Sequence, residues 1–110
     1  MKKTLVLVLA GIFCLSSNIF AKSIDQLPMY GNKPKTDAQK KADEEFIQLV
    51  QKEMSLSKGA EHQVKRGWEA FYDRDNATAM KRFNQAWLLN PNNADIYWGF
   101  GDVLGSENKF

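Results

Sequence analysis

The chain contains few of the residue types from which catalytic and metal sites are usually built. Its 110 residues include one cysteine, Cys14, and one histidine, His62. A zinc finger, a histidine metal site or a cysteine–histidine catalytic pair each needs further members that the sequence does not supply. No GxSxG nucleophile elbow is present, and the glycines at 99, 101 and 105 neither follow a strand pattern nor precede GKS or GKT, which argues against a phosphate-binding loop. We therefore expect a protein that is not an enzyme and that uses no metal and no cofactor.

Long apolar runs are also missing. The longest, residues 5–15, has 11 residues, whereas a transmembrane helix needs about 20. It follows the basic tip Lys2-Lys3 and is followed by polar residues and then by the small residue Ala21. A basic tip, a short apolar core and a small residue at the cut are typical of a secretory signal peptide. We predict a signal peptide over residues 1–21, so that the chain meets the membrane only during export; an uncleaved anchor is the alternative.

Without this signal peptide the chain has no cysteine and no excess of either charge. Cys14 lies inside the signal peptide, and its neighbours Gly11 and Phe13 do not fit a lipoprotein signal, so we expect no lipid anchor. The remaining 89 residues carry 13 basic and 13 acidic side chains. A neutral chain gives no electrostatic case for binding nucleic acid or an anionic membrane surface. Because the MKKT start resembles bacterial signal peptides, the expected location is the periplasm, with secretion as the alternative.

The rest of the chain contains helical patterns and large aromatic residues. Residues 22–36 hold two prolines and one glycine without a helical or strand period, and we predict an extended linker there. Its apolar residues leave a second reading open, in which the segment docks on the helical body or on a partner. They are Ile24, Leu27, Met29 and Tyr30.

Four helices are predicted, and no part of the chain shows a strand pattern. The first covers residues 37–54, with Thr36 or Asp37 as its cap and an apolar stripe at three- and four-residue spacing. The stripe comprises Ala38, Ala42, Phe46, Leu49, Val50 and Met54. The others are predicted over residues 58–73, 76–89 and 94–104, with Ser57 capping the second and Asp75 or Asn76 the third. The expected fold class is therefore all-α, with a helical domain at residues 58–105.

Small and aromatic residues recur at fixed spacing from Gly67 onwards. Ala79 follows after twelve residues, and three more positions follow Ala79 by four, seven and twelve residues: Phe83, Ala86 and Pro91. Thirty-four residues after Gly67 comes Gly101, preceded by Tyr97 and Phe100. This pattern resembles the tetratricopeptide repeat, a 34-residue helix–turn–helix unit. It departs from that family at Gln63, Arg66, Ala70 and Arg74.

The resemblance covers residues 60–104 and implies one full repeat followed by the first helix of a second. Arrays of this family usually need at least three repeats and a polar cap. The helix over residues 37–54 can cover one end, whereas residues 94–104 either cap the other end or leave an open apolar edge. An open edge predicts self-association through residues 94–104, or a protein partner. An ordinary small helical bundle is the alternative fold.

The resemblance also implies a concave face lined by the first helix of each repeat. On this sequence that face comprises Glu61, Val64, Trp68, Phe71, Tyr72, Asp95, Trp98 and Asp102. Aromatic area beside carboxylates suits an extended peptide, since the rings supply contact and the charges supply orientation. The candidate partner-binding residues are Trp68, Tyr72, Asp95, Trp98 and Asp102. The alternative is that Trp68, Phe71 and Trp98 belong to the core.

The expected function is that of an exported, non-catalytic scaffold or assembly module that binds another protein or peptide. The runner-up is a small periplasmic carrier that holds a hydrophobic ligand in an aromatic-lined helical pocket. A third reading is a structural fragment with no function of its own. A carrier requires an enclosed cavity, whereas a scaffold requires an open groove or an apolar edge.

Overall fold

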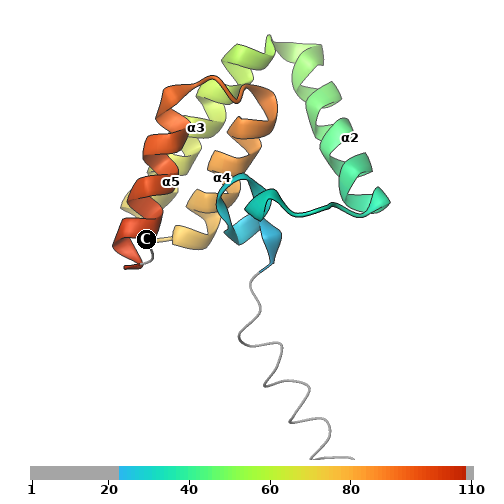
Figure 1. Ribbon diagram of the computed structural model, residues 1–110. Helices are drawn as coiled ribbons and strands as arrows, with labels where there is room; N and C mark the ends of the chain where they lie inside the picture. Colours follow the sequence, from blue (N-terminus) through green and yellow to red (C-terminus); the bar gives the residue numbers. More distant parts are fainter. Residues whose placement is uncertain (1–22, 109–110) are drawn as a thin grey trace, which may run out of the picture.

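Four α-helices and two short 3-10 turns make up the part of the chain that the computed structural model describes, residues 23–108 (Figure 1). In chain order they are η1 (Ile24–Gln26), η2 (Pro28–Asn32), α2 (Asp37–Glu53), α3 (Leu56–Tyr72), α4 (Asn76–Leu89) and α5 (Ala94–Ser106). No strand is present between residues 23 and 108, so the all-α fold class is confirmed for this part of the chain. The predicted signal peptide, residues 1–21, and Cys14 within it lie outside the described residues.

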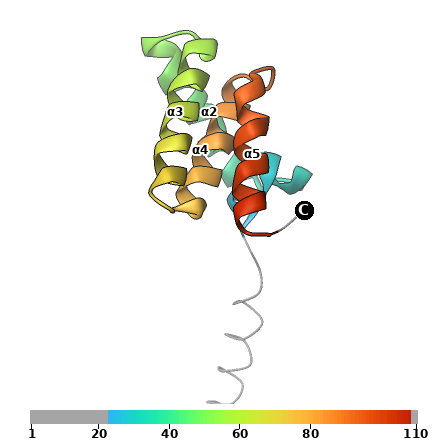
Figure 2. The same cartoon turned by 90° about the vertical axis from the view of Figure 1, so that its left-hand side faces the viewer.

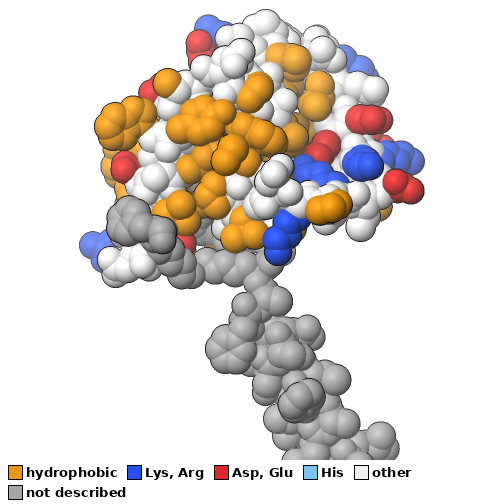
Figure 3. Space-filling model, viewed as in Figure 1, with side chains coloured by type: hydrophobic (Ala, Val, Ile, Leu, Met, Phe, Trp, Pro, Cys, Tyr) orange, Lys and Arg blue, Asp and Glu red, His pale blue; other side chains and the backbone are white. Residues whose placement is uncertain are grey.

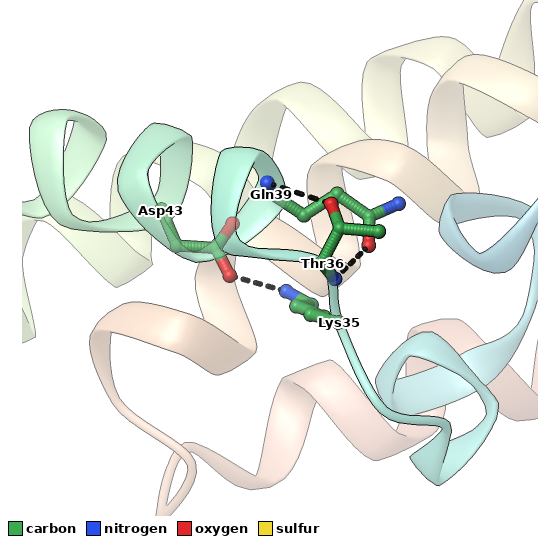
Figure 4. Close-up of polar contacts among 4 residues, drawn as sticks. All are labelled: Lys35, Thr36, Gln39 and Asp43. Atoms are coloured by element: carbon green, nitrogen blue, oxygen red, sulfur yellow. Dashed lines mark hydrogen bonds and ion pairs between the residues drawn. The ribbon is translucent and has the colours of Figure 1, made fainter.

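Two of the predicted helix caps are present. Thr36 begins α2 with a capping box: the Gln39 N–H donates to Thr36 Oγ1 at 3.1 Å, and the Thr36 N–H donates to Gln39 Oε1 at 2.8 Å (Figure 4). Asp75 begins α4 by accepting from the Thr78 N–H at 3.1 Å. Hydrogen bonds from the Thr78 side chain and backbone hold the pKa of the Asp75 carboxyl below its ordinary value.

The second helix begins earlier than predicted. Its cap is Ser55 rather than Ser57, because the Ser55 hydroxyl accepts from the Lys58 N–H at 3.1 Å. As a result α3 starts at Leu56 instead of residue 58. The helix α4 covers the predicted residues, and α5 continues to Ser106, two residues beyond the predicted end.

Residues 24–32 do not form the extended linker that the sequence predicts. They fold into η1 and η2, and Tyr30 is buried with its ring centroid 6.3 Å from that of Trp87 on α4. Met29, Tyr30 and Gly31 have left-handed backbone angles, with φ of 54°, 57° and 65°. Left-handed angles cost about 1–2 kcal/mol per non-glycine residue, and the burial of Tyr30 helps to offset that cost. The second reading of the sequence, in which this segment docks on the helical body, is therefore confirmed for Tyr30, whereas Met29 remains exposed.

The core lies around α4, with α3 on one side and α5 on the other (Figure 2). Its buried hydrophobic residues are Ala60, Val64, Ala79, Met80, Phe83, Ala86, Leu89, Ile96, Phe100 and Val103. All of these belong to α3, α4 or α5. The three helices therefore form the body of the protein, and α2 lies beside it.

The Phe83 ring is held between two glycines. A Cβ placed on Gly67 of α3 would lie 2.5 Å from Phe83 Cε1, and a Cβ on Gly99 of α5 would lie at the same distance from that atom. The close approach at Gly67 is thus made by an aromatic ring and not by the backbone of another helix. Gly101 does not repeat this packing, since it is exposed and nothing lies within 4 Å of its Cβ position. The 34-residue recurrence of glycine therefore does not reproduce the contact of Gly67.

The helix α2 stands apart from the other three (Figure 1), and none of its residues is buried. It packs against the core through Phe46, Ile47 and Val50, which are partly buried. Three members of its predicted apolar stripe are instead exposed: Ala38, Ala42, and Leu49 with 63% of its surface accessible. The stripe is therefore only partly covered.

Replacing Gly67 by alanine should destabilise the protein even though alanine is the better helix former. The added methyl would overlap the Phe83 ring, which Gly99 prevents from moving away. Overpacking of this kind costs about 1–3 kcal/mol. The free energy of unfolding, measured by urea denaturation with circular dichroism, should fall by this amount.

The matched control is Gly101→Ala. Nothing lies within 4 Å of its Cβ position, so helix propensity alone should raise stability, by up to about 1 kcal/mol. Equal effects of the two substitutions would contradict the packing of Phe83 described above.

Candidate functional site

The two candidate residues of α3 form a stacked aromatic pair. The ring centroids of Trp68 and Tyr72 lie 6.1 Å apart, with an interplanar angle of 25°. Trp68 is half-buried, because its ring also meets the Phe83 ring edge-on at 5.2 Å. Tyr72 is 76% exposed. Trp68 therefore belongs partly to the core, whereas Tyr72 is a surface residue.

The three candidate residues of α5 lie on one exposed face. Asp95, Trp98 and Asp102 are spaced by three and four residues, which places them on the same side of a helix, and Trp98 is 68% exposed. Figure 3 shows hydrophobic side chains gathered on the side of the molecule that carries α5, and charged side chains on the side of α2. A shallow hollow of about 430 Å³ is lined by Ala94, Tyr97, Trp98, Gly101 and Asp102.

The aromatic pair of α3 and the face of α5 are connected through Phe83. Trp68 packs directly on the Phe83 ring, and Gly99, the neighbour of Trp98 in the sequence, touches the same ring from α5. The hollow does not extend to the aromatic pair of α3, since every residue that lines it belongs to α5. The candidate residues therefore form two exposed patches on neighbouring helices, and not one closed groove.

A second hollow, which the sequence analysis missed, lies between α2, α4 and the N-terminal segment. Its volume is about 590 Å³. Its apolar part is formed by Ile24, Tyr30, Phe46 and Leu88, and its charged rim by Lys35, Asp43 and Lys81. One of its walls is the segment predicted to be an extended linker. The sequence left open that this segment docks on the helical body, but it did not indicate a cleft between the segment, α2 and α4.

Lys35 connects the N-terminal segment to α2 at the rim of this cleft. Its Nζ pairs with the Asp43 carboxylate (Figure 4) and lies 3.4 Å from the centroid of the Tyr30 ring. Burial, together with the negative charges of Asp43 and Asp25, raises the pKa of the Tyr30 hydroxyl above its ordinary value. The Tyr30 hydroxyl therefore keeps its proton to a higher pH than an exposed tyrosine does.

Asn84 fastens the N-terminal segment to α4. Its side chain is fully buried, and Nδ2 donates hydrogen bonds to the carbonyl oxygens of Asp25 and Leu27, at 3.1 and 2.9 Å. The surrounding face of α4 is otherwise apolar, with Met80 and Phe83 among its buried residues. A polar residue within an apolar stripe needs a hydrogen-bond partner. Asn84 is therefore the sequence signal that could have indicated a docked segment.

Comparisons with known proteins assign no family to the chain. It matches no protein-family model, no curated protein and no solved structure. Over residues 23–108, no helix is both long enough and apolar enough to cross a membrane. The same residues contain no group of three or more His, Cys, Asp or Glu side chains placed to hold a metal ion. The features that bear on function are therefore the exposed aromatic patches of α3 and α5 and the cleft beside the N-terminal segment.

Asn84→Ala should release the N-terminal segment while leaving the hairpin of α3 and α4 folded. The substitution leaves the carbonyl groups of Asp25 and Leu27 without their donor, and an unsatisfied buried group costs about 1–3 kcal/mol. Hydrogen exchange followed by mass spectrometry should show faster exchange in residues 24–33 and unchanged exchange in α3.

Gln26→Ala provides the control for this test. It removes one hydrogen bond at an exposed site, from Gln26 Nε2 to the Ala77 carbonyl at 3.2 Å, and should have a smaller effect. If Asn84→Ala leaves the exchange of residues 24–33 unchanged, Asn84 does not hold the segment in place.

Proposed function

We propose that this chain is an exported, non-catalytic module for protein–protein interaction that uses the exposed faces of α3 and α5 as its binding surface. The observation that carries the proposal is the exposure of three large aromatic residues: Tyr72 at 76%, Tyr97 at 44% and Trp98 at 68%. Tyr72 belongs to the exposed patch of α3, and Tyr97 and Trp98 belong to that of α5; exposed apolar patches mark interaction sites on soluble proteins. Trp and Tyr are also among the residues most enriched at binding hot spots.

A tetratricopeptide-like unit accounts for this arrangement. In this reading α3 and α4 are the two helices of one repeat, and α5 is the first helix of the next. The buried positions of Gly67, Ala79, Phe83 and Ala86 support it, because close packing of two helices needs small residues beside a large one. The exposure of Gly101 is a departure from it. In this reading the exposed α5 face belongs to the second repeat.

The proposed location is the periplasm, with secretion as the alternative. This part of the proposal rests on the signal-peptide pattern of residues 1–21 and on nothing in the folded body. The partner would then be another exported protein or a peptide present in the same compartment.

The cleft between α2, α4 and the N-terminal segment favours a second candidate function, a carrier for a small hydrophobic ligand. Its volume of about 590 Å³ falls within the roughly 300–1,000 Å³ of typical ligand sites, and Phe46 and Leu88 supply apolar surface. Its lining also includes the exposed residues Gln39 and Lys81, so the cleft opens to solvent. Carriers bury most of their ligand, and the interaction module is therefore the better supported function.

Trp98→Ala and Tyr72→Ala should each abolish partner binding without affecting folding. Both side chains are largely exposed, so the free energy of unfolding should fall by less than about 0.5 kcal/mol for Trp98→Ala and by at most about 1.5 kcal/mol for Tyr72→Ala, which also loses its stack on Trp68. Truncation of an aromatic hot spot lowers binding free energy by about 2 kcal/mol or more. The measurement is the amount of each protein captured from an envelope extract by the immobilised variants, compared with their unfolding midpoints.

Lys41→Ala is the control for this experiment, because Lys41 is exposed on α2, away from both aromatic patches. It should capture the same proteins as the unaltered chain. Equal capture by all the variants would rule out the α3 and α5 faces as the binding surface.

Long-chain fatty acids should leave the melting temperature unchanged if the chain is an interaction module. A carrier at a ligand concentration of 100 times Kd would instead gain about 2.7 kcal/mol of stability. Thermal unfolding with and without palmitate measures the difference. A stabilisation that Phe46→Ala removes would establish the carrier function in place of the proposed one.

A further inference from the structure

The exposed face of α5 carries negative charge only. Asp95 and Asp102 are both exposed, and α5 contains no Lys, Arg or His between Ala94 and Ser106. Neither carboxylate has an ion-pair or hydrogen-bond partner among the described residues. They are seven positions apart, which corresponds to about 10 Å along the helix. An occupant of this face therefore meets two unpaired carboxylates with the Trp98 indole between them.

Arginine is the side chain that fits this combination best. Its planar guanidinium can stack on an aromatic face and at the same time donate two parallel hydrogen bonds to a carboxylate. Trp98 and Asp102 are four residues apart and line the same hollow. Lysine has a point charge without the planar group, and so it can satisfy only part of this site.

The hollow has room for the aliphatic part of such a side chain. Gly101 lies between Tyr97 and Asp102 in the lining, and nothing lies within 4 Å of its Cβ position. The methylene groups of arginine commonly lie along apolar surface while the charged end reaches a polar group. Gly101 would serve as the floor of the site, with Tyr97 and Trp98 as its apolar walls.

A second copy of this chain is a poor occupant of the same face. Packing α5 on α5 would bring two pairs of carboxylates together without a cation on either helix. The charge pattern therefore favours a partner of opposite charge over self-association.

We propose that the α5 face binds an extended, arginine-bearing segment of another protein, with one arginine on Trp98 and Asp102 and a second on Asp95. This proposal rests on the interaction function above and names the chemistry of its partner. In the extended polyproline II conformation three residues make one turn and rise about 9 Å, so arginines three positions apart lie on the same side of the segment and match the spacing of the two carboxylates. The required partner segment thus has the form Arg-x-x-Arg.

The test is calorimetric titration of the full-length chain with a nine-residue peptide that carries two arginines three positions apart in an alanine and glycine background. The arginine peptide should bind at least about fivefold more tightly than the same peptide with lysine, and the citrulline version should not bind. Asp95→Asn and Asp102→Asn should each weaken binding about tenfold. Raising the salt concentration should weaken binding as well, since the pairs are exposed.

Gly101→Leu tests the hollow itself. The position is open, so the substitution should not disturb folding, but the new side chain fills the floor and should prevent binding of the arginine peptide. The control is Gly105→Ala, which adds a methyl beyond the residues that line the hollow and should leave binding unchanged.

Three results would overturn the proposal. They are equal binding of a glutamate or uncharged peptide, unchanged binding in both aspartate variants, and no binding of the arginine peptide by a folded chain. A dimer seen by sedimentation that Trp98→Ala dissociates would make a second copy the occupant instead. If the arginine peptide fails while Trp98→Ala still abolishes capture from the extract, the interaction function stands and only the partner chemistry is wrong.

Discussion

The position of every functional candidate depends on how closely α3 and α5 approach one aromatic ring. Phe83 projects from α4 into a space that Gly67 and Gly99 leave free of side chains. Its ring then meets Trp68 at 5.2 Å and Phe100 at 6.4 Å, both edge-on. Because the interior is close-packed, a larger residue in place of Gly67 or Gly99 could not be accommodated without moving the Phe83 ring or a helix. This contact therefore determines where the outer faces of both helices lie.

The helices themselves could be predicted because their signals are local. From the sequence, Asp75 correctly predicts the start of α4, and Asn90-Pro91 correctly predicts its end. The start of α3 could not be predicted in the same way, since Ser55 and Ser57 are both suitable caps. The N-terminal turns were missed because they depend on Asn84, which lies 59 residues from Asp25 and 57 from Leu27.

The candidate site shows the same division between local and long-range information. The repeat resemblance placed Asp95, Trp98 and Asp102 together on a binding face, and in the structure all three are exposed on α5. Spacing could not decide whether Trp98 belongs to the core, because burial depends on whether another helix covers α5. The period of 34 residues drew attention to Gly101, whereas the glycine that touches the Phe83 ring is Gly99. On α5, Gly99 lies on the packed side, and Gly101, two residues later, lies on the exposed side.

The most direct test of this account is a nuclear Overhauser measurement between the ring protons of Phe83 and the α-protons of Gly67 and Gly99. The account predicts cross-peaks from the ring to both glycines, because each lies against it. It also predicts no cross-peak from the ring to the α-protons of Gly101, which face solvent. Cross-peaks to Gly101 in place of Gly99 would show that α5 is rotated, and would contradict the exposed face on which the proposed function rests.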